Sequence, residues 1–445
     1  MSASPIVRIG AGAGFAGDRI EPAIELLEHG QLDFIAFECL AERTIALAQE
    51  RRRADPDHGY DPMLLERMRR ALPVARARGT RIVTNAGAAN PIAAAHAVAE
   101  LARSLGLGGL RIAAVTGDDV LPLVRGASLP LIDPPGTSGD LGPIVSANAY
   151  LGAAPIAVAL DRGADIVITG RVGDPALFIG PLVHAFGWSL DDHALIGRAT
   201  VIGHLLECAG QLTGGYFADG DRKAVPDLAR LGFPLAEVAA DASAIVTKVP
   251  GTGGIVSLAT CKEQLLYEIL DPAAYHQADV IADFTSVRLS EAGPDRVAVS
   301  GGGGRPPSGE LKVTIGYDDG FVGEGQISYA GRDAATRARM ALDIVRERLA
   351  LTAVPLRESR FDLMGVDSVD FTAGEGAPRE VRIRVAGRTD TAEAAAAIGA
   401  EVEALYTNGP MGGGGATRSV RRVVAAASAL VPATAVQTAI TMIEA

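Results

Sequence analysis

The chain has 445 residues, of which 48% are hydrophobic and 21% charged, and its formal net charge is 41 − 53 = −12. This apolar content is sufficient for large cores and excludes wholesale disorder. The length suggests roughly two to four domains at about 100–200 residues each. An acidic chain repels phosphodiester backbones and anionic lipid, so we expect neither nucleic acid nor membrane as a partner.

The cysteines indicate a reducing compartment. Cys39, Cys208 and Cys261 lie too far apart in the sequence for a disulfide framework or a spaced zinc site. The first ten residues have no basic flank followed by an apolar core, so we expect no secretory signal. No uncharged apolar run approaches the ~20 residues of a membrane span. We therefore expect a cytoplasmic protein.

Through about residue 285, short β-branched runs alternate with longer alanine- and leucine-rich segments. Strands are expected at 6–9, 33–37, 81–84, 111–115, 165–169, 244–248 and 280–284. Helices are expected at 20–29, 40–53, 62–78, 91–105, 147–162, 175–186 and 192–212. This alternation predicts an α/β fold with a mostly parallel sheet that helices cover on both faces.

The pattern changes after residue 286. Strand-like segments at 296–300, 310–317 and 321–329, separated by glycine-rich turns, predict antiparallel pairing, and a helix follows at 333–349. Strands near 360–365 and 380–385, a helix at 390–405 and segments at 419–430 and 435–443 predict a small α+β domain. The expected domains are thus 1–285, Rossmann-like and catalytic, then 286–355, an antiparallel extension with a helix, and 356–445.

The first strand is followed by a glycine-rich loop. Gly12, Gly14 and Gly17 form G-x-G-x-x-G between a strand and a helix, where backbone amides can approach an anion. We expect Gly14 to contact the ligand. A dinucleotide is an alternative, since Glu38 lies about 20 residues further on and can hold a ribose. The second alternative is that the glycines only form a tight turn with close helix–strand packing.

Polar residues also follow the next strands. Asn85 ends a strand and is expected in the crevice where open sheets bind ligands, whereas Asn90 has the position of a helix N-cap. Asp118 and Asp119 follow another strand and can orient a hydroxyl, bind a metal or cap the following turn. Because adjacent side chains of an extended chain point apart, only one of the two is expected in the site.

Three cationic or glycine-rich loops complete this set. Arg171 offers a planar fork for a carboxylate or phosphate, and Asp174 is either a ligand contact, a helix N-cap or the partner of Arg171 in an ion pair. Lys248 precedes glycines in a plausible cradle for a carboxylate or a CoA pyrophosphate. Asn408 precedes a run of four glycines, which a backbone wrapped around a ligand needs.

A polar stripe ends the helix predicted at 192–212. His204, Glu207, Cys208 and Gln211 have the spacing i, i+3, i+4 and i+7 and share one helical face. This arrangement can place a general base beside a nucleophilic or acidic thiol. The alternatives are a metal site and a buried, hydrogen-bonded stripe with an inert cysteine.

Several of these blocks together resemble the acyclic terpene utilisation protein AtuA family. They are residues 8–18, 83–87, 115–119, 165–174, 203–215 and 405–415. The resemblance implies a role in the bacterial breakdown of citronellol, geraniol and related branched acids as CoA thioesters. It also implies that this shorter form relies on a separate small subunit. The family's reaction is unassigned, so the resemblance transfers no catalytic residue.

The sequence predicts an enzyme of small-acid or acyl-CoA catabolism, of the lyase or hydratase type. Loops rich in Gly, Asn, Asp, Arg and Lys suit a small anionic substrate or an acyl-CoA better than a planar cofactor. Arg171 and Lys248 are expected to stabilise an enolate, while Asp118, His204, Glu207 or Cys208 moves the proton. The predicted substrate contacts are Gly14, Asn85, Arg171, Asp174, Lys248 and Asn408.

No metal or cofactor is assigned, and a homo-oligomer is expected. Two alternatives remain open. The first is an oxidoreductase that binds a dinucleotide at the first glycine loop. The second is a non-catalytic large subunit of an acyl-CoA-processing complex.

Overall fold

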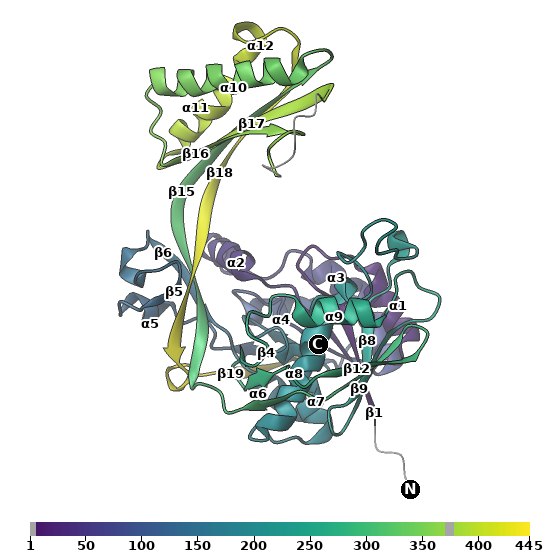
Figure 1. The fold of residues 1–445 in the computed structure, drawn as a ribbon. Coiled ribbons are helices and arrows are strands. Elements are labelled where there is room, and N and C mark those ends of the chain that lie inside the picture. Colours follow the sequence, from purple (N-terminus) through teal and green to yellow (C-terminus); the bar gives the residue numbers. More distant parts are fainter. Residues whose placement is uncertain (1–5, 370–377) are drawn as a thin grey trace. The chain divides into compact units, whose positions relative to one another are not determined.

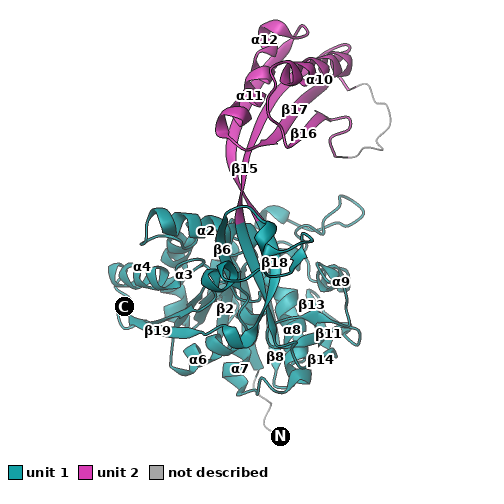
Figure 2. Cartoon of the chain, turned by 90° about the vertical axis from the view of Figure 1, so that its left-hand side faces the viewer, with its two compact units in different colours: residues 1–316, 426–445 teal, residues 317–425 magenta. Residues whose placement is uncertain are grey.

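A computed structural model describes residues 6–369 and 378–445. The described chain divides into two compact units (Figure 2). Unit 1 comprises Met1–Gly316 and Ala426–Ala445, and unit 2 comprises Tyr317–Ala425. The domain boundaries expected near residues 285 and 355 stay a prediction, because a compact unit need not be an independently folding domain.

The large sheet of unit 1 has a parallel centre (Figure 1). Its strands lie in the order β1 (Ile6–Ala13), β2 (Phe34–Phe37), β3 (Arg81–Thr84), β7 (Ile166–Thr169) and β4 (Arg111–Thr116). Each neighbouring pair is parallel. The short β-branched runs of the sequence become these buried strands, as a sheet covered on both faces requires.

Antiparallel strands extend the centre on both sides. Beyond β1 follow β8 (Pro234–Ala239), β9 (Ala244–Lys248), β13 (Arg296–Ser300) and β12 (Arg288–Gly293), and beyond β4 lies β19 (Ala439–Glu444). The fold is therefore mixed α/β. The expectation of a mostly parallel sheet applies only to its centre. The further strands of this unit are short: β5 (Leu131–Asp133), β6 (Ile144–Ala149), β10 (Tyr275–His276), β11 (Ile281–Asp283) and β14 (Gly303–Arg305).

Two sets of helices pack on this sheet. α1 (Glu21–His29), α3 (Leu64–Arg78) and α4 (Pro91–Ser104) contact one another in succession, as do α6 (Ala154–Asp161), α7 (Ala176–Phe186) and α8 (His193–Glu207). Along the sheet, the chain passes from β1 through β2 and β3 to β4, and then returns to β7 between β3 and β4. Because connections between parallel strands are right-handed, this reversal places the two sets of helices on opposite faces of the sheet. The remaining helices of unit 1 are α2 (Glu42–Ala54), α5 (Leu121–Arg125) and α9 (Leu258–Leu266). Within the described ranges, no helix is long and apolar enough to cross a membrane.

Two predicted segments are wrong. The helix expected at 147–162 begins only at Ala154, because the preceding residues belong to β6 and the Asp279 carboxylate accepts a hydrogen bond from the Ala153 amide at 2.8 Å. The strands expected at 310–317 and 321–329 form one strand, β15 (Glu310–Ala330). Its glycines permit close helix packing and not a reversal: a Cβ atom at Gly323 would lie 1.9 Å from the Ala395 carbonyl oxygen.

Unit 2 is a sheet covered by helices. The strand order is β16 (Glu358–Met364), β17 (Glu380–Thr389), β15 and β18 (Gly413–Pro432). α10 (Ala334–Leu351) and α11 (Ala392–Glu403) pack on β17, and the short α12 (Leu405–Asn408) follows. Alternate residues of the strands, such as Ile327 and Ile383, are fully buried with Val345 and Ile398 of the helices in one apolar core.

We predict that Gly197→Ala destabilises unit 1, because a Cβ atom there would lie 2.0 Å from the Gly303 carbonyl oxygen where α8 crosses β14. Overpacking costs about 1–3 kcal/mol and exceeds the ~1 kcal/mol gain in helix propensity. Urea unfolding measures the difference. Gly303→Ala is the control, since a Cβ atom at Gly303 meets nothing within 4 Å. Equal stability of both variants would contradict the prediction.

Candidate functional site

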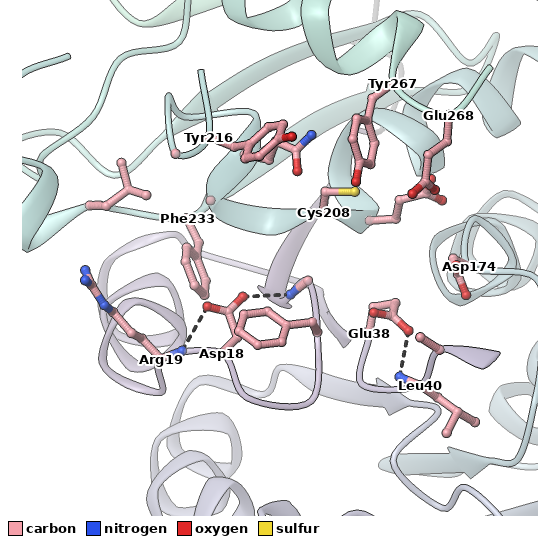
Figure 3. Close-up of a pocket in the computed structure, with 18 of the residues that line it drawn as sticks. Asp18, Arg19, Glu38, Leu40, Asp174, Cys208, Tyr216, Phe233, Tyr267 and Glu268 are labelled. Atoms are coloured by element: carbon pink, nitrogen blue, oxygen red, sulfur yellow. Dashed lines mark hydrogen bonds between the residues drawn. The ribbon is translucent and has the colours of Figure 1, made fainter. Parts of the chain in front are cut away.

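A pocket of about 680 Å³ lies in unit 1 where β1, β2 and β7 end (Figure 3). Its volume falls in the ~300–1,000 Å³ range of small-molecule sites. Gly14 follows β1, Glu38 follows β2, and Arg171 and Asp174 follow β7. The carboxyl ends of parallel strands meet at one edge of the sheet, so loops distant in sequence converge there. The end of α8, the segment 210–233 that follows it and the residues after α9 complete the lining.

Arg171 contacts several segments around the pocket, although its Nε has no hydrogen-bond partner among the described residues. Its side chain is 2% exposed and donates from Nη2 to Asp174 Oδ1 at 2.9 Å and from Nη1 to the Leu40 carbonyl. Its guanidinium stacks 4.0 Å from the ring centre of Tyr150. Its backbone amide donates to Asp118 Oδ2 at 2.9 Å. The ion pair weighed as an alternative for Arg171 and Asp174 is therefore present.

Two carboxyl groups near this arginine bind protons unusually tightly. Glu38 Oε1 accepts hydrogen bonds from the Leu40 amide at 2.7 Å and from Asn85 Nδ2 at 3.0 Å. Burial, reinforced by the charge of Asp174, nevertheless raises the pKa of Glu38 to about 8. Burial also raises the pKa of Asp174, against the pull of Arg171. Glu38 thus holds a proton at neutral pH that an isolated carboxylate would release.

Glu42 behaves in the opposite way. Its Oε1 accepts a hydrogen bond from the Tyr150 hydroxyl at 2.5 Å and pairs with Lys312 at 3.3 Å. Burial alone would raise its pKa, but the Tyr150 hydrogen bond and the Arg171 charge lower the pKa to about 2. A permanently ionised carboxylate therefore lies in the same lining as a protonated one. Divergent environments of this kind mark acid and base roles.

The end of α8 contributes a second carboxyl group. Glu207 Oε1 lies 2.7 Å from His204 Nδ1, while Glu207 Oε2 is buried with no hydrogen-bond partner among the described residues. Burial raises the pKa of Glu207 to about 7. His204 itself is 1% exposed and packs against the rings of Tyr275 and Phe284, so it lies behind Glu207 and does not line the pocket.

Cys208 lines the pocket as a neutral thiol. α8 ends at Glu207, and Cys208 is its C-cap. Burial raises the pKa of the Cys208 thiol above its ordinary value, and the neighbouring Glu207 charge raises it further. Nucleophilic cysteines depend on the opposite shift. The geometry thus favours an inert cysteine over a nucleophile at this position.

Asp118 and Asn85 lie directly behind the lining. Asp118 Oδ2 accepts hydrogen bonds from the Arg171 amide and from Asn148 Nδ2 at 2.8 Å, and burial raises the pKa of Asp118 to about 6. Asn85 is fully buried and bridges the Cys39 amide and the Glu38 carboxyl group. Both therefore position groups of the pocket. In the described part of the chain, no cluster of three or more His, Cys, Asp and Glu side chains has a metal-binding arrangement.

Lys248 and Asn408 lie elsewhere. Lys248 Nζ donates to the Thr252 carbonyl at 2.8 Å and pairs with Asp295 at 3.3 Å, and it is absent from the lining. Asn408 belongs to unit 2, where its amide donates to the Ala404 carbonyl. Their ligand roles stay predictions that the pocket does not support.

The first glycine loop is mainly a packing device. A Cβ atom at Gly12 would lie 2.5 Å from the Phe37 ring, and one at Gly14 would lie 2.5 Å from the Cys208 backbone. α1 begins only at Glu21, so no helix N-terminus directly follows the glycines. This arrangement favours the interpretation of the motif as close packing over a dinucleotide cradle.

Several lining residues were not predicted from the sequence. Glu42 resembled an ordinary acidic residue in the first turn of a helix, and Asp18 a turn residue whose carboxylate accepts from the Gly14 amide at 2.9 Å. The apolar residues of the lining come mostly from loops without any periodic pattern. The missed residues of the lining include Phe15, Asp18, Arg19, Leu40, Ala41, Glu42, Tyr216, Leu228, Leu231, Phe233, Tyr267 and Glu268.

We predict that Glu38→Gln stabilises the protein at alkaline pH. Since folding raises the pKa of Glu38 from its ordinary 4.5 to about 8, the wild type loses stability as pH rises from about 4.5 to 8. The variant should gain on the order of 2 kcal/mol over the wild type near pH 9 and nothing near pH 4. Thermal unfolding across this range measures the difference. A pH-independent difference, or one matched by the exposed Glu100→Gln on α4, would count against it.

We predict that Cys208 reacts slowly with iodoacetamide. Cys39 and Cys261 are fully buried and Cys208 is partly exposed, so Cys208 is the first thiol the reagent reaches. Its raised pKa should make alkylation near pH 8 at least about tenfold slower than that of a free cysteine. Mass spectrometry of timed samples measures the rate. Rapid labelling of Cys208 in folded protein would show that a thiolate is present.

A comparison with known protein families finds a match over nearly the whole chain. The family model described as "Acyclic terpene utilisation family protein AtuA" matches residues 7–442. The chain belongs to this family. Neither the curated proteins nor the solved structures give a match.

Proposed function

We propose that this member of the AtuA family is a catabolic enzyme of acyclic terpene utilisation, a lyase of the hydratase or dehydratase type. Its substrate would be a small branched or unsaturated acid or the CoA thioester of one. The observation that carries this proposal is that Glu38 and Asp174 line one pocket, where Asp174 is ion-paired with the buried Arg171 and burial raises the pKa of both carboxyl groups. Paired carboxyl groups of this kind can both give and accept a proton.

The lining of the pocket offers groups for both parts of such a substrate. In Figure 3, Glu38 and Asp174 lie on one side of the pocket and Phe233 lies on the other, beside Asp18 and Arg19. The apolar and aromatic residues of the lining include Phe15, Tyr216, Leu228, Leu231 and Phe233. A branched hydrocarbon chain gains free energy against these residues, while its double bond or hydroxyl group meets the carboxyl groups.

Glu38 and Asp174 would divide the proton transfers of hydration. Glu38 is protonated below about pH 8 and can donate its proton to the substrate. Asp174, held by Arg171 at 2.9 Å, can accept the proton of the attacking water. Asn85 and the Leu40 amide fix one oxygen of Glu38 and leave the other for the reaction. The reverse sequence of transfers eliminates water.

We predict that Glu38→Gln and Asp174→Asn each lower kcat by about 10²–10⁴, the usual contribution of a positioned acid or base. Glu100→Gln, on the exposed face of α4, should leave kcat unchanged. Purified protein is incubated with methyl-branched unsaturated acids, with the corresponding hydroxy acids and with the CoA thioesters of both. Mass spectrometry follows the gain or loss of water.

The pH profile supplies a second readout. If Glu38 donates the proton, kcat falls as pH rises above about 8, and this decline disappears in Glu38→Gln. Absence of turnover by the wild type over the whole panel would contradict the proposed reaction. Wild-type activity in both variants would contradict the assigned roles and not the reaction.

A further inference from the structure

The lining of the pocket carries far more acidic than basic groups. Its basic residues are Arg19 and Arg171. Its acidic residues are Asp18, Glu38, Glu42, Asp174, Glu207 and Glu268. Even with a proton on Glu38 and another on Glu207, carboxylates outnumber guanidinium groups.

Neither arginine is free to neutralise an anion deep in the pocket. The charge of Arg171 is already matched by Asp174, and its two Nη atoms donate to Asp174 and the Leu40 carbonyl, which leaves only the buried Nε without a partner among the described residues. Arg19 is exposed and donates to backbone carbonyls, including that of Leu228 at 3.3 Å, so it can meet a charged end of the ligand only at the rim. An enolate formed inside would therefore lie among carboxylates that outnumber the arginines of the lining.

Two observations independent of this acidity point to a bound group of the opposite sign. Glu207 is 7% exposed and lines the pocket, and its Oε2 has no hydrogen-bond partner among the described residues. A buried carboxylate oxygen without a partner is costly unless a ligand supplies one. The rings of Tyr216 and Tyr267 also lie in the lining, 6.3 Å apart, and aromatic faces attract cations.

We propose that the reacting part of the substrate becomes positively charged in this pocket, so that water adds through a tertiary carbocation of a branched acyclic chain and not through an enolate. This inference rests on the proposed hydratase function and specifies its substrate class: a chain with a trisubstituted double bond, or the tertiary alcohol formed from it. A carboxylate elsewhere on the chain stays at the rim near Arg19.

The step balances without any further reagent. The O–H bond of Glu38 breaks, and the π electrons of the double bond form a new C–H bond, which leaves a tertiary cation and the Glu38 carboxylate. A lone pair of water forms the C–O bond, and the proton released from that oxygen passes to Asp174. Transfer of this proton from Asp174 to Glu38 restores the starting state. Dehydration of the tertiary alcohol follows the same path backwards.

The test compares three ligands that share one branched chain of about ten carbons and differ only at one end. The first ends in a protonated dimethylammonium group, which has the shape and charge of a tertiary cation, the second in a neutral alcohol and the third in a carboxylate. Calorimetry with the full chain near pH 7 measures each Kd. We expect the ammonium ligand to bind at least about tenfold more tightly than the alcohol. The carboxylate ligand should bind more weakly than the ammonium ligand, because its charge is accommodated only at the rim near Arg19.

Charge-neutralising variants locate the effect. Glu207→Gln and Glu268→Gln should each weaken ammonium binding about three- to tenfold and leave alcohol binding within about twofold. Glu268 is exposed at the pocket, so its replacement is expected to fold even if Glu207→Gln does not. Glu100→Gln should change neither Kd, because Glu100 is exposed on α4 and outside the lining.

The outcomes separate this inference from the proposed function. A carboxylate ligand that binds as tightly as the ammonium ligand, or an ammonium ligand no tighter than the alcohol, would overturn the inference even if hydration is observed. If the ammonium ligand is preferred but no substrate is turned over, the result would support a pocket that favours a positively charged ligand and would overturn the proposed reaction. Loss of alcohol binding together with ammonium binding in Glu268→Gln would show a structural effect and also overturn the inference.

Discussion

The burial of one guanidinium group constrains the arrangement of the whole pocket. A charged side chain that is 2% exposed is tolerated only when its hydrogen bonds and charge are matched nearby. For Arg171 the match comes from Asp174 on its own loop, from the Leu40 carbonyl before α2, and from the Tyr150 ring after β6. Three segments far apart in sequence are thereby fixed around one charge. Removal of Arg171 would leave Asp174 without its ion-pair partner and Glu42 with Lys312 alone.

The same charge explains why similar carboxyl groups take opposite protonation states. Glu42 accepts a hydrogen bond from the Tyr150 hydroxyl and lies beside Lys312, so it stays ionised down to about pH 2. Glu38 accepts hydrogen bonds from the Leu40 backbone amide and from the Asn85 side-chain amide. The charge of Asp174 also raises the pKa of Glu38. Arg171 influences both, yet its charge is insufficient for three carboxylates. The proton that Glu38 keeps at neutral pH is therefore the one available for chemistry.

Much of the centre of the fold was predictable because apolar β-branched runs specify buried strands. The strands β3, β9 and β13 have the residues expected from the sequence. Gly14, Arg171 and Asp174 were predicted for the pocket because the carboxyl ends of parallel strands converge. Lys248 also ends a strand, but β8 separates β9 from β1, and Asp295 on the turn after β12 binds the amine. No local pattern in the sequence reports that pairing.

An error in one element also concealed a residue of the site. The expected helix at 147–162 would have placed Tyr150 on a helical face, whereas the chain there is extended after β6 and stacks Tyr150 on Arg171. Glu42, whose carboxylate accepts a hydrogen bond from the Tyr150 hydroxyl, was therefore not predicted from the sequence. The sequence thus indicated residues of the pocket but not the pairing that sets their charge. Which sign of charge a pocket favours depends on the groups that the protein has already paired, and that pairing is a property of the tertiary structure.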